Sequence, residues 1–212
     1  SLDHLSATAP DPAAAGARLE RLREDPEARR MLGLLAPASL RTVVNLISVS
    51  RFLFHFICRQ PTAMAVIGTG TPVTLPAQRA VDHELLLETK YRELLRIACE
   101  DLAARQPYEQ VLQDLSNLAE RTVRSALDLA AAGGNSRALH DAVCIFALGK
   151  LGAAELNFSS DLDLIYVSAN GTDGDIETLQ KQLMDGLRRF SRLLEERNEH
   201  GFLYRVDLNL RP

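Results

Sequence analysis

Apolar residues recur at three- and four-residue steps through most of the first 136 residues. This spacing places them on one face of an α-helix, with polar residues around the rest. Asp25-Pro26 marks one helix start, because Asp is a favoured N-cap and Pro fits the first helical position. The patterns predict helices over residues 13–24, 26–35, 37–57, 76–104 and 108–132. Residues 1–12 and 68–76 are predicted to be loops. The polar residues Arg92, Arg96, Glu100 and Arg121 are expected to form a solvated face.

The pattern changes after Gly133-Gly134. Short apolar runs and a final stretch in which apolar and polar residues alternate are typical of β-strands. These patterns predict strands over residues 141–148, 161–167 and 202–212, and helices over 151–157 and 176–197. The fold class is therefore expected to be α+β, with a helical region over residues 1–136 and a small sheet with flanking helices over residues 137–212. A sheet that ends at Pro212 looks incomplete, so we expect the natural protein to continue.

Two carboxylates, Asp161 and Asp163, begin the second predicted strand. Residues two apart on a strand share a face, with Cβ atoms roughly 6–7 Å apart. Asp207 lies on the polar face of the last predicted strand and is expected to come near them. Carboxylates that converge in this way suit hard divalent cations. Taken alone, Asp207 is equally consistent with an ion pair to an arginine.

Composition excludes several classes of function. The chain has 212 residues and a net charge of −4, so binding to nucleic acid or to an anionic membrane surface is not expected. No apolar run approaches the ~20 residues that span a bilayer, and the N-terminus has no signal-peptide pattern. Cys58, Cys99 and Cys144 lie far apart in apolar segments without zinc spacing. They are expected to be buried free thiols of a cytoplasmic protein.

Two long motifs resemble one family. They are Ala147-Leu-Gly-Lys-Leu-Gly-Ala-Ala-Glu-Leu-Asn-Phe-Ser-Ser-Asp-Leu-Asp-Leu-Ile-Tyr166 and Gly201-Phe-Leu-Tyr-Arg-Val-Asp-Leu-Asn-Leu-Arg-Pro212. Together with Lys90-Tyr-Arg-Glu-Leu-Leu-Arg-Ile-Ala98 and Ser50-Arg-Phe-Leu53, they resemble the bifunctional glutamine synthetase adenylyltransferases/adenylyl-removing enzymes. That family belongs to the polymerase-beta-like nucleotidyltransferase superfamily. The likeness runs from about residue 40 to the end of the chain.

The resemblance implies a site. Asp161, Asp163 and Asp207 would be the catalytic residues and the ligands of Mg²⁺ or Mn²⁺. The phosphate and nucleotide would be bound by Gly149, Lys150, Ser159, Ser160, Arg205 and Arg211. Taken alone, the glycine would be an ordinary turn residue and the lysine a solvated one. The chain departs from the family pattern at Asn209, where a basic residue is expected, and at Ala153-Ala154, where glycine is expected.

The resemblance also implies a function. The family has one domain that removes AMP from a glutamine synthetase tyrosine by phosphorolysis and another that adds it from ATP. Glu155-Leu-Asn-Phe-Ser-Ser160 and Tyr204-Arg-Val-Asp207 look more like the removing domain, so removal with release of ADP is expected. The implied partners are glutamine synthetase, the PII signal protein, ATP or ADP, and phosphate, in nitrogen metabolism. ATP-dependent addition and a non-catalytic partner-binding module remain alternatives.

Overall fold

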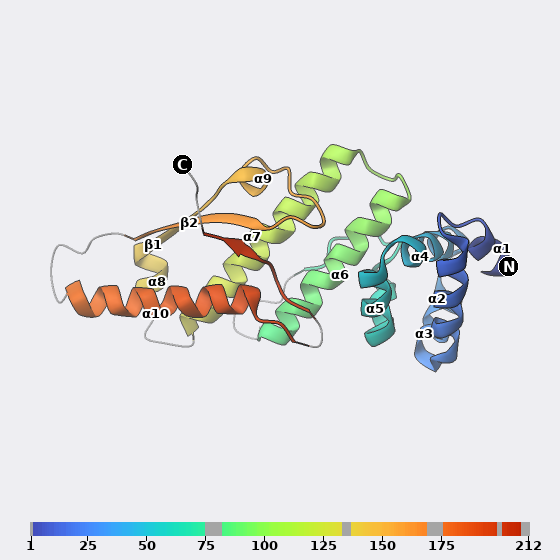
Figure 1. The fold of residues 1–212 in the computed structure, drawn as a ribbon, viewed down its shortest axis with the longest axis horizontal. Coiled ribbons are helices and arrows are strands. Elements are labelled where there is room, and N and C mark those ends of the chain that lie inside the picture. The colour runs from blue at the N-terminus through green and yellow to red at the C-terminus, as the bar shows by residue number, and fades with distance from the viewer. Residues whose placement is uncertain (1, 75–81, 133–136, 169–175, 199–200, 209–212) are drawn as a thin grey trace. The chain divides into compact units, whose positions relative to one another are not determined.

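The computed structural model describes residues 2–74, 82–132, 137–168, 176–198 and 201–208 (Figure 1). The elements are, in order, α1 (Leu2–Ala7), α2 (Pro12–Glu24), α3 (Pro26–Leu34), α4 (Pro37–Val49), α5 (Arg51–Arg59), the 3₁₀ helix η1 (Pro61–Val66), α6 (His83–Leu102), α7 (Tyr108–Ala132), α8 (Arg137–Ala142), β1 (Val143–Ala147), α9 (Gly149–Gly152), β2 (Leu162–Ser168), α10 (Ile176–Glu195) and β3 (Val206–Asp207). Many helices with one small sheet confirm the predicted α+β class.

The chain forms two compact units, each of which is discontinuous in sequence. Unit 1 comprises residues 1–73 and 91–111, and unit 2 comprises residues 74–90 and 112–212. This spatial division differs from the predicted boundary near residue 136. That boundary was placed where the sequence pattern changes from helices to strands. The strands and all the described candidate site residues lie in unit 2.

Aspartates begin two of the helices in unit 1. Asp25 Oδ1 accepts a hydrogen bond from the Ala28 amide at 2.7 Å, and Pro26 takes the first helical position, as the sequence predicts. Asp11 caps α2 in the same way, through the Ala14 amide at 3.0 Å. The prediction that residues 1–12 form a loop is wrong, because α1 is helical there. Its residues Leu2 and Leu5 pack against a buried cluster, which supplies the burial that stabilises so short a helix.

The helix predicted from Pro37 begins there as α4, but its predicted extension to residue 57 is wrong, because the chain turns at Ser50. The hydroxyl of Ser50 accepts a hydrogen bond from the Leu53 amide at 3.2 Å and caps α5. Serine favours such a cap over a helix interior, since its side chain satisfies an amide that has no partner within the helix.

Over the described ranges, no single helix is long and apolar enough to cross a membrane. The pair α4 and α5 reaches that length and composition together, bent by 118°.

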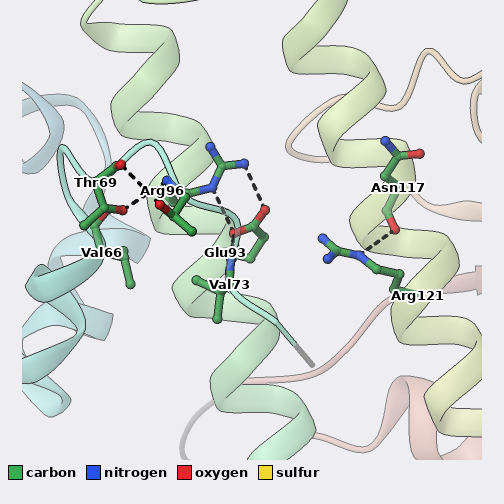
Figure 2. A network of polar contacts seen from close by, with 8 residues as sticks. Val66, Thr69, Val73, Glu93, Arg96, Asn117 and Arg121 are labelled. Atoms are coloured by element: carbon green, nitrogen blue, oxygen red, sulfur yellow. Dashed lines mark hydrogen bonds and ion pairs between the residues drawn. The ribbon is translucent and has the colours of Figure 1, made fainter. Parts of the chain in front are cut away.

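The solvated face predicted for α6 is wrong for two of its residues, because Arg96 and Glu100 are buried. Arg96 donates from Nε and Nη2 to the neighbouring buried carboxylate of Glu93, both at 2.9 Å. The amide of Val73 donates to Glu93 Oε2 at 2.8 Å (Figure 2). Burial of these charges is tolerated because Arg96 pairs with Glu93, and Glu100 accepts a hydrogen bond from Arg105 Nη1 at 2.8 Å.

The sheet has the order β1-β2-β3 and is mixed (Figure 1). The strands β1 and β2 pair antiparallel, with Phe146 opposite Ile165, and β2 pairs parallel with β3. Even-numbered residues of β2 face the helices: Leu162 and Leu164 are buried, and the Tyr166 ring meets Phe190 of α10 edge-on at 5.7 Å. Strand alternation therefore turns the odd-numbered residues to the opposite face.

Three further boundaries differ from prediction. The helix predicted over residues 151–157 is instead α9, which ends at Gly152, and α8 precedes β1 without having been predicted. A side chain at Gly152 would come within 2.6 Å of the Ala147 carbonyl oxygen, so the chain passes very close to β1 here. The strand predicted from residue 202 is wrong over residues 202–205 and at Leu208, because only Val206–Asp207 form strand β3 among the described residues. The predicted loop 170–175, residues 76–81 of a predicted helix and residues 209–212 lie outside the described residues.

Candidate active site

Two of the three predicted carboxylates lie opposite each other on neighbouring strands. Asp163 of β2 is the register partner of Asp207 of β3. The Leu162 amide donates to the Arg205 carbonyl oxygen at 2.9 Å and aligns the two strands. Register partners on adjacent strands present their side chains to the same face of a sheet. This face is the one turned away from the buried Leu162 and Leu164, so the two carboxylates sit side by side on the outer face.

The third carboxylate, Asp161, is engaged by an arginine. Its Oδ1 accepts a hydrogen bond from Arg205 Nε at 2.7 Å. Both side chains are about half exposed, at 48% for Asp161 and 57% for Arg205. Sequence reasoning expected an arginine pair as the alternative for Asp207, but the structure places such a pair at Asp161. Arg205 thus neutralises one of the carboxylates that the sequence assigns to a cation.

The expected meeting of all three carboxylates is therefore only partly seen. Over the ranges that the structure describes, no group of three His, Cys, Asp or Glu side chains is placed to hold a metal ion. The chemistry of the donor set still suits Mg²⁺ or Mn²⁺, because two carboxylates lie on one sheet face, a third directly precedes β2, and such ions prefer oxygen ligands. Asp163 and Asp207 are register partners, whereas Asp161 is paired with Arg205.

Gly149 lies directly beside the side chain of Asp163. Its φ of +51° lies in the left-handed region. A Cβ atom added there would lie 2.2 Å from Asp163 Oδ2. The Leu148 amide also donates to the Asp163 carbonyl oxygen, at 2.8 Å. Glycine is needed here for its backbone conformation and for the room that it leaves to the carboxylate. Its predicted part in binding a phosphate stays a prediction.

The remaining predicted phosphate ligands differ in their surroundings. Lys150 and Ser159 are exposed, whereas Ser160 is half-buried. The Ser160 hydroxyl donates to Asn157 Oδ1 at 2.8 Å, and the Ser159 amide donates to the same oxygen at 3.2 Å. Ser160 therefore holds the turn before β2. Arg211 lies outside the described residues.

Sequence reasoning missed the residue that anchors this turn to α7. The Ser116 side chain is fully buried, and its hydroxyl accepts a hydrogen bond from the Leu156 amide at 3.0 Å. The same hydroxyl donates to the Leu112 carbonyl oxygen at 2.8 Å. A serine among the apolar residues of α7 was the only available signal, and such a serine usually bonds within its own helix.

The cysteines are free thiols, as expected, but only one of them is buried. Cys99 is buried, Cys58 is half-buried, and Cys144 is exposed on β1. The expectation of a buried Cys144 is wrong, because it lies on the same strand face as the exposed Phe146, away from the helices. Burial raises the pKa of the Cys99 thiol to about 12.

Comparison with known proteins points to one family. The family model for glutamate-ammonia ligase adenylyltransferase matches residues 40–212. Curated relatives carry the name bifunctional glutamine synthetase adenylyltransferase/adenylyl-removing enzyme. The relative from Nitrosococcus oceani is 38% identical over 60% of the chain and 15% of its own length. The relative from Stenotrophomonas maltophilia is 32% identical over 83% of the chain and 21% of its own length.

A relative from Streptomyces avermitilis bears the same name. It is 32% identical over the whole chain and 22% of its own length. The chain thus spans between 15% and 22% of the length of these three curated relatives. The matched residues include both strands that carry the candidate carboxylates.

Proposed function

Because the chain belongs to the glutamate-ammonia ligase adenylyltransferase family, we propose that it takes part in adenylyl transfer on glutamine synthetase, in the direction of removal. In this reaction inorganic phosphate attacks the α-phosphorus of the AMP that is attached to a tyrosine. A phosphate oxygen–phosphorus bond forms and the tyrosyl oxygen–phosphorus bond breaks. The products are ADP and the tyrosine hydroxyl, which takes up a proton.

The observation that carries this proposal is the pairing of Asp163 with Asp207 in register on β2 and β3. Transfer of a nucleotidyl group depends mainly on positioning and on neutralising the charge that develops on phosphate oxygens. Adjacent carboxylates on a strand-supported face provide fixed oxygen ligands for that purpose. We propose that Asp161, Asp163 and Asp207 hold Mg²⁺ or Mn²⁺, which when bound would neutralise phosphate charge.

The chain also offers cations for the incoming phosphate. Lys150 follows Gly149 directly and is exposed, and Arg205 lies beside Asp161. The Arg205–Asp161 pair is about half exposed on both sides, so it is expected to contribute only about 0–1 kcal/mol. A bound phosphate can therefore draw Arg205 away at little cost, and this movement would free Asp161 for a cation. Ser159, which is exposed at the end of the same turn, is a further proposed phosphate ligand.

Addition of AMP from ATP is the second candidate. It is favoured by the names of the curated relatives, which describe both activities. Removal is preferred because Glu155-Leu-Asn-Phe-Ser-Ser160 and Tyr204-Arg-Val-Asp207 resemble the removing domain. The same carboxylates would serve either direction, since both pass through the same kind of phosphorus centre.

The test is to incubate the full-length protein that carries this chain with adenylylated glutamine synthetase, phosphate and Mg²⁺, and to identify the products. Release of ADP that depends on phosphate supports removal. Formation of pyrophosphate from ATP and unmodified glutamine synthetase supports addition, provided that it is lost in Asp163→Asn. Neither product, with retained binding to glutamine synthetase, would support a partner-binding module and contradict the proposal.

A further inference from the structure

The strand that carries Asp207 is held mainly by the chain before it. In the described residues β3 comprises only Val206 and Asp207. Its few hydrogen bonds to β2 therefore contribute little to holding this segment in place. Leu203 is fully buried, and the Tyr204 amide donates to the Leu194 carbonyl oxygen at 2.9 Å. The Val206 amide lies 3.3 Å from Glu195 Oε1. The position of Asp207 therefore depends on how firmly residues 203–206 sit against the end of α10.

A buried lysine of α6 meets this segment. The side chain of Lys90 is 7% exposed, and its Nζ lies 4.8 Å from the centre of the Tyr204 ring. Seven residues earlier, and thus on the same face of α6, His83 Nε2 lies 2.8 Å from the Leu193 carbonyl oxygen. Residues from one face of α6 therefore hold both the last turn of α10 and the segment that follows it.

An ammonium group is a costly choice for such a place. Burial lowers the pKa of Lys90 to about 7, because the charged form is penalised away from water. A methionine would fill similar space without that penalty. The electron-rich face of the Tyr204 ring attracts the ammonium and offsets part of the cost. The interaction also has a direction, which an apolar contact lacks, and it fixes the ring that directly precedes Arg205.

We propose that Lys90 is a positioning residue that acts through the Tyr204 ring. It holds residues 203–207 so that the Arg205 carbonyl oxygen stays bonded to the Leu162 amide and Asp207 stays opposite Asp163. The proposal deepens the proposed function and rests on it for its catalytic consequence. Lys90 itself has no part in the chemistry. Its effect on the structure of the segment is independent of which reaction the site performs.

The catalytic test compares Lys90→Met, Lys90→Arg and Tyr204→Leu at about pH 6.5, below the pKa of Lys90, where the ammonium predominates. The control is Lys181→Met, the same change at an exposed lysine of α10. Lys90→Met and Tyr204→Leu are each expected to lower kcat by about tenfold or more, because misplaced groups lose rate steeply. KM for adenylylated glutamine synthetase should stay within about twofold. Lys90→Arg should retain most of the wild-type kcat. The double variant Lys90→Met/Tyr204→Leu should have a kcat no lower than that of either single variant.

Hydrogen exchange supplies a readout that does not require activity. In Lys90→Met, the amides of residues 203–207 and of Leu162 should exchange about tenfold faster than in the wild type. Lys90→Arg should restore protection, and Lys181→Met should leave it unchanged. Unaltered exchange in both Lys90→Met and Tyr204→Leu would overturn the proposal. If the amides exchange faster in Lys90→Met but the wild type forms neither ADP nor pyrophosphate, the result contradicts the proposed function and leaves the positioning role of Lys90 supported.

Discussion

Gly149 and Asp163 are packed so closely that no side chain fits between them: a Cβ atom on the glycine would lie 2.2 Å from the carboxylate oxygen Oδ2. The obstacle is the end of a flexible side chain, so the carboxylate would move rather than the backbone. Gly149 also has a φ of +51°, which favours glycine. The turn and the candidate catalytic carboxylate are therefore coupled by steric fit.

Substitution Gly149→Ala should affect activity far more than stability. The strained φ is expected to cost about 1–2 kcal/mol, whereas displacement of Asp163 should lower kcat by about a hundredfold. The matched control is Gly70→Ala, because Gly70 has a φ of +63° and no atom within 4 Å of the added Cβ. Thermal unfolding and a product assay on both variants test this. Equal activity in the two variants would show that the steric contact does not matter.

Substitution Ser116→Ala should destabilise the protein by about 1–3 kcal/mol, since it leaves the buried Leu156 amide without its acceptor. Thr122→Val is the control. Its hydroxyl is also fully buried, but it donates to the Leu118 carbonyl oxygen of its own helix. Such a back-bond adds little to stability. Denaturant unfolding should separate the two variants, and a similar small loss in both would contradict the anchoring role of Ser116.

Lys90 should make stability depend on pH. Burial lowers the pKa of Lys90 from 10.5 to about 7 in the folded state. Between these values the unfolded state binds one more proton than the folded state, so the contribution of this group to stability rises with pH. Above pH 7, the free energy of unfolding of the wild type should therefore rise relative to that of Lys90→Met by up to about 1 kcal/mol per pH unit. Below that pH the difference should level off. Denaturant unfolding at several pH values measures it, and a constant difference between pH 7 and 9 would contradict the assignment.

The cysteines should differ in reactivity. Cys144 is exposed, whereas Cys99 is buried with a pKa raised to about 12, so almost none of it is thiolate at neutral pH. An alkylating reagent followed by peptide mass analysis should label Cys144 first and Cys99 only on unfolding. Cys144→Ser should remove the fast phase. Labelling of Cys99 in the native protein at the rate of Cys144 would show that its side chain is accessible.

Much of the architecture follows from short-range patterns. Helix-forming composition located α2, the spacing of apolar residues located α6 and α7, and a short apolar run located β2. The alternation of side chains along a strand then gave the face of β2 that carries Asp163. These features depend on residues a few positions apart. The break at Ser50 was missed because a single serine is compatible both with a helix interior and with a cap. Only the packing of the neighbouring helices decides between them.

The candidate site also depends on tertiary contacts that the sequence does not reveal. Sequence reasoning identified Asp161 and Arg205, but it could not show that they pair, because the partners are 44 residues apart. It also placed Arg96 and Glu100 on a solvated face. Glu93 lies three residues before Arg96 on the same helix, but the sequence does not show that the packing of α6 buries this pair. The role of Ser116 was hidden for the same reason. Long-range polar contacts require the fold before they can be recognised.

The most direct test of the central claim is to measure ADP formation by the full-length wild type and by Asp163→Asn in parallel, with adenylylated glutamine synthetase, phosphate and Mg²⁺. Asp185→Asn serves as the control, since Asp185 lies on α10 in an exposed pair with Arg188. We expect ADP from the wild type and the control, and a loss of about a thousandfold or more in Asp163→Asn. Wild-type rates of ADP formation by Asp163→Asn would contradict the assignment of the chemistry to these carboxylates.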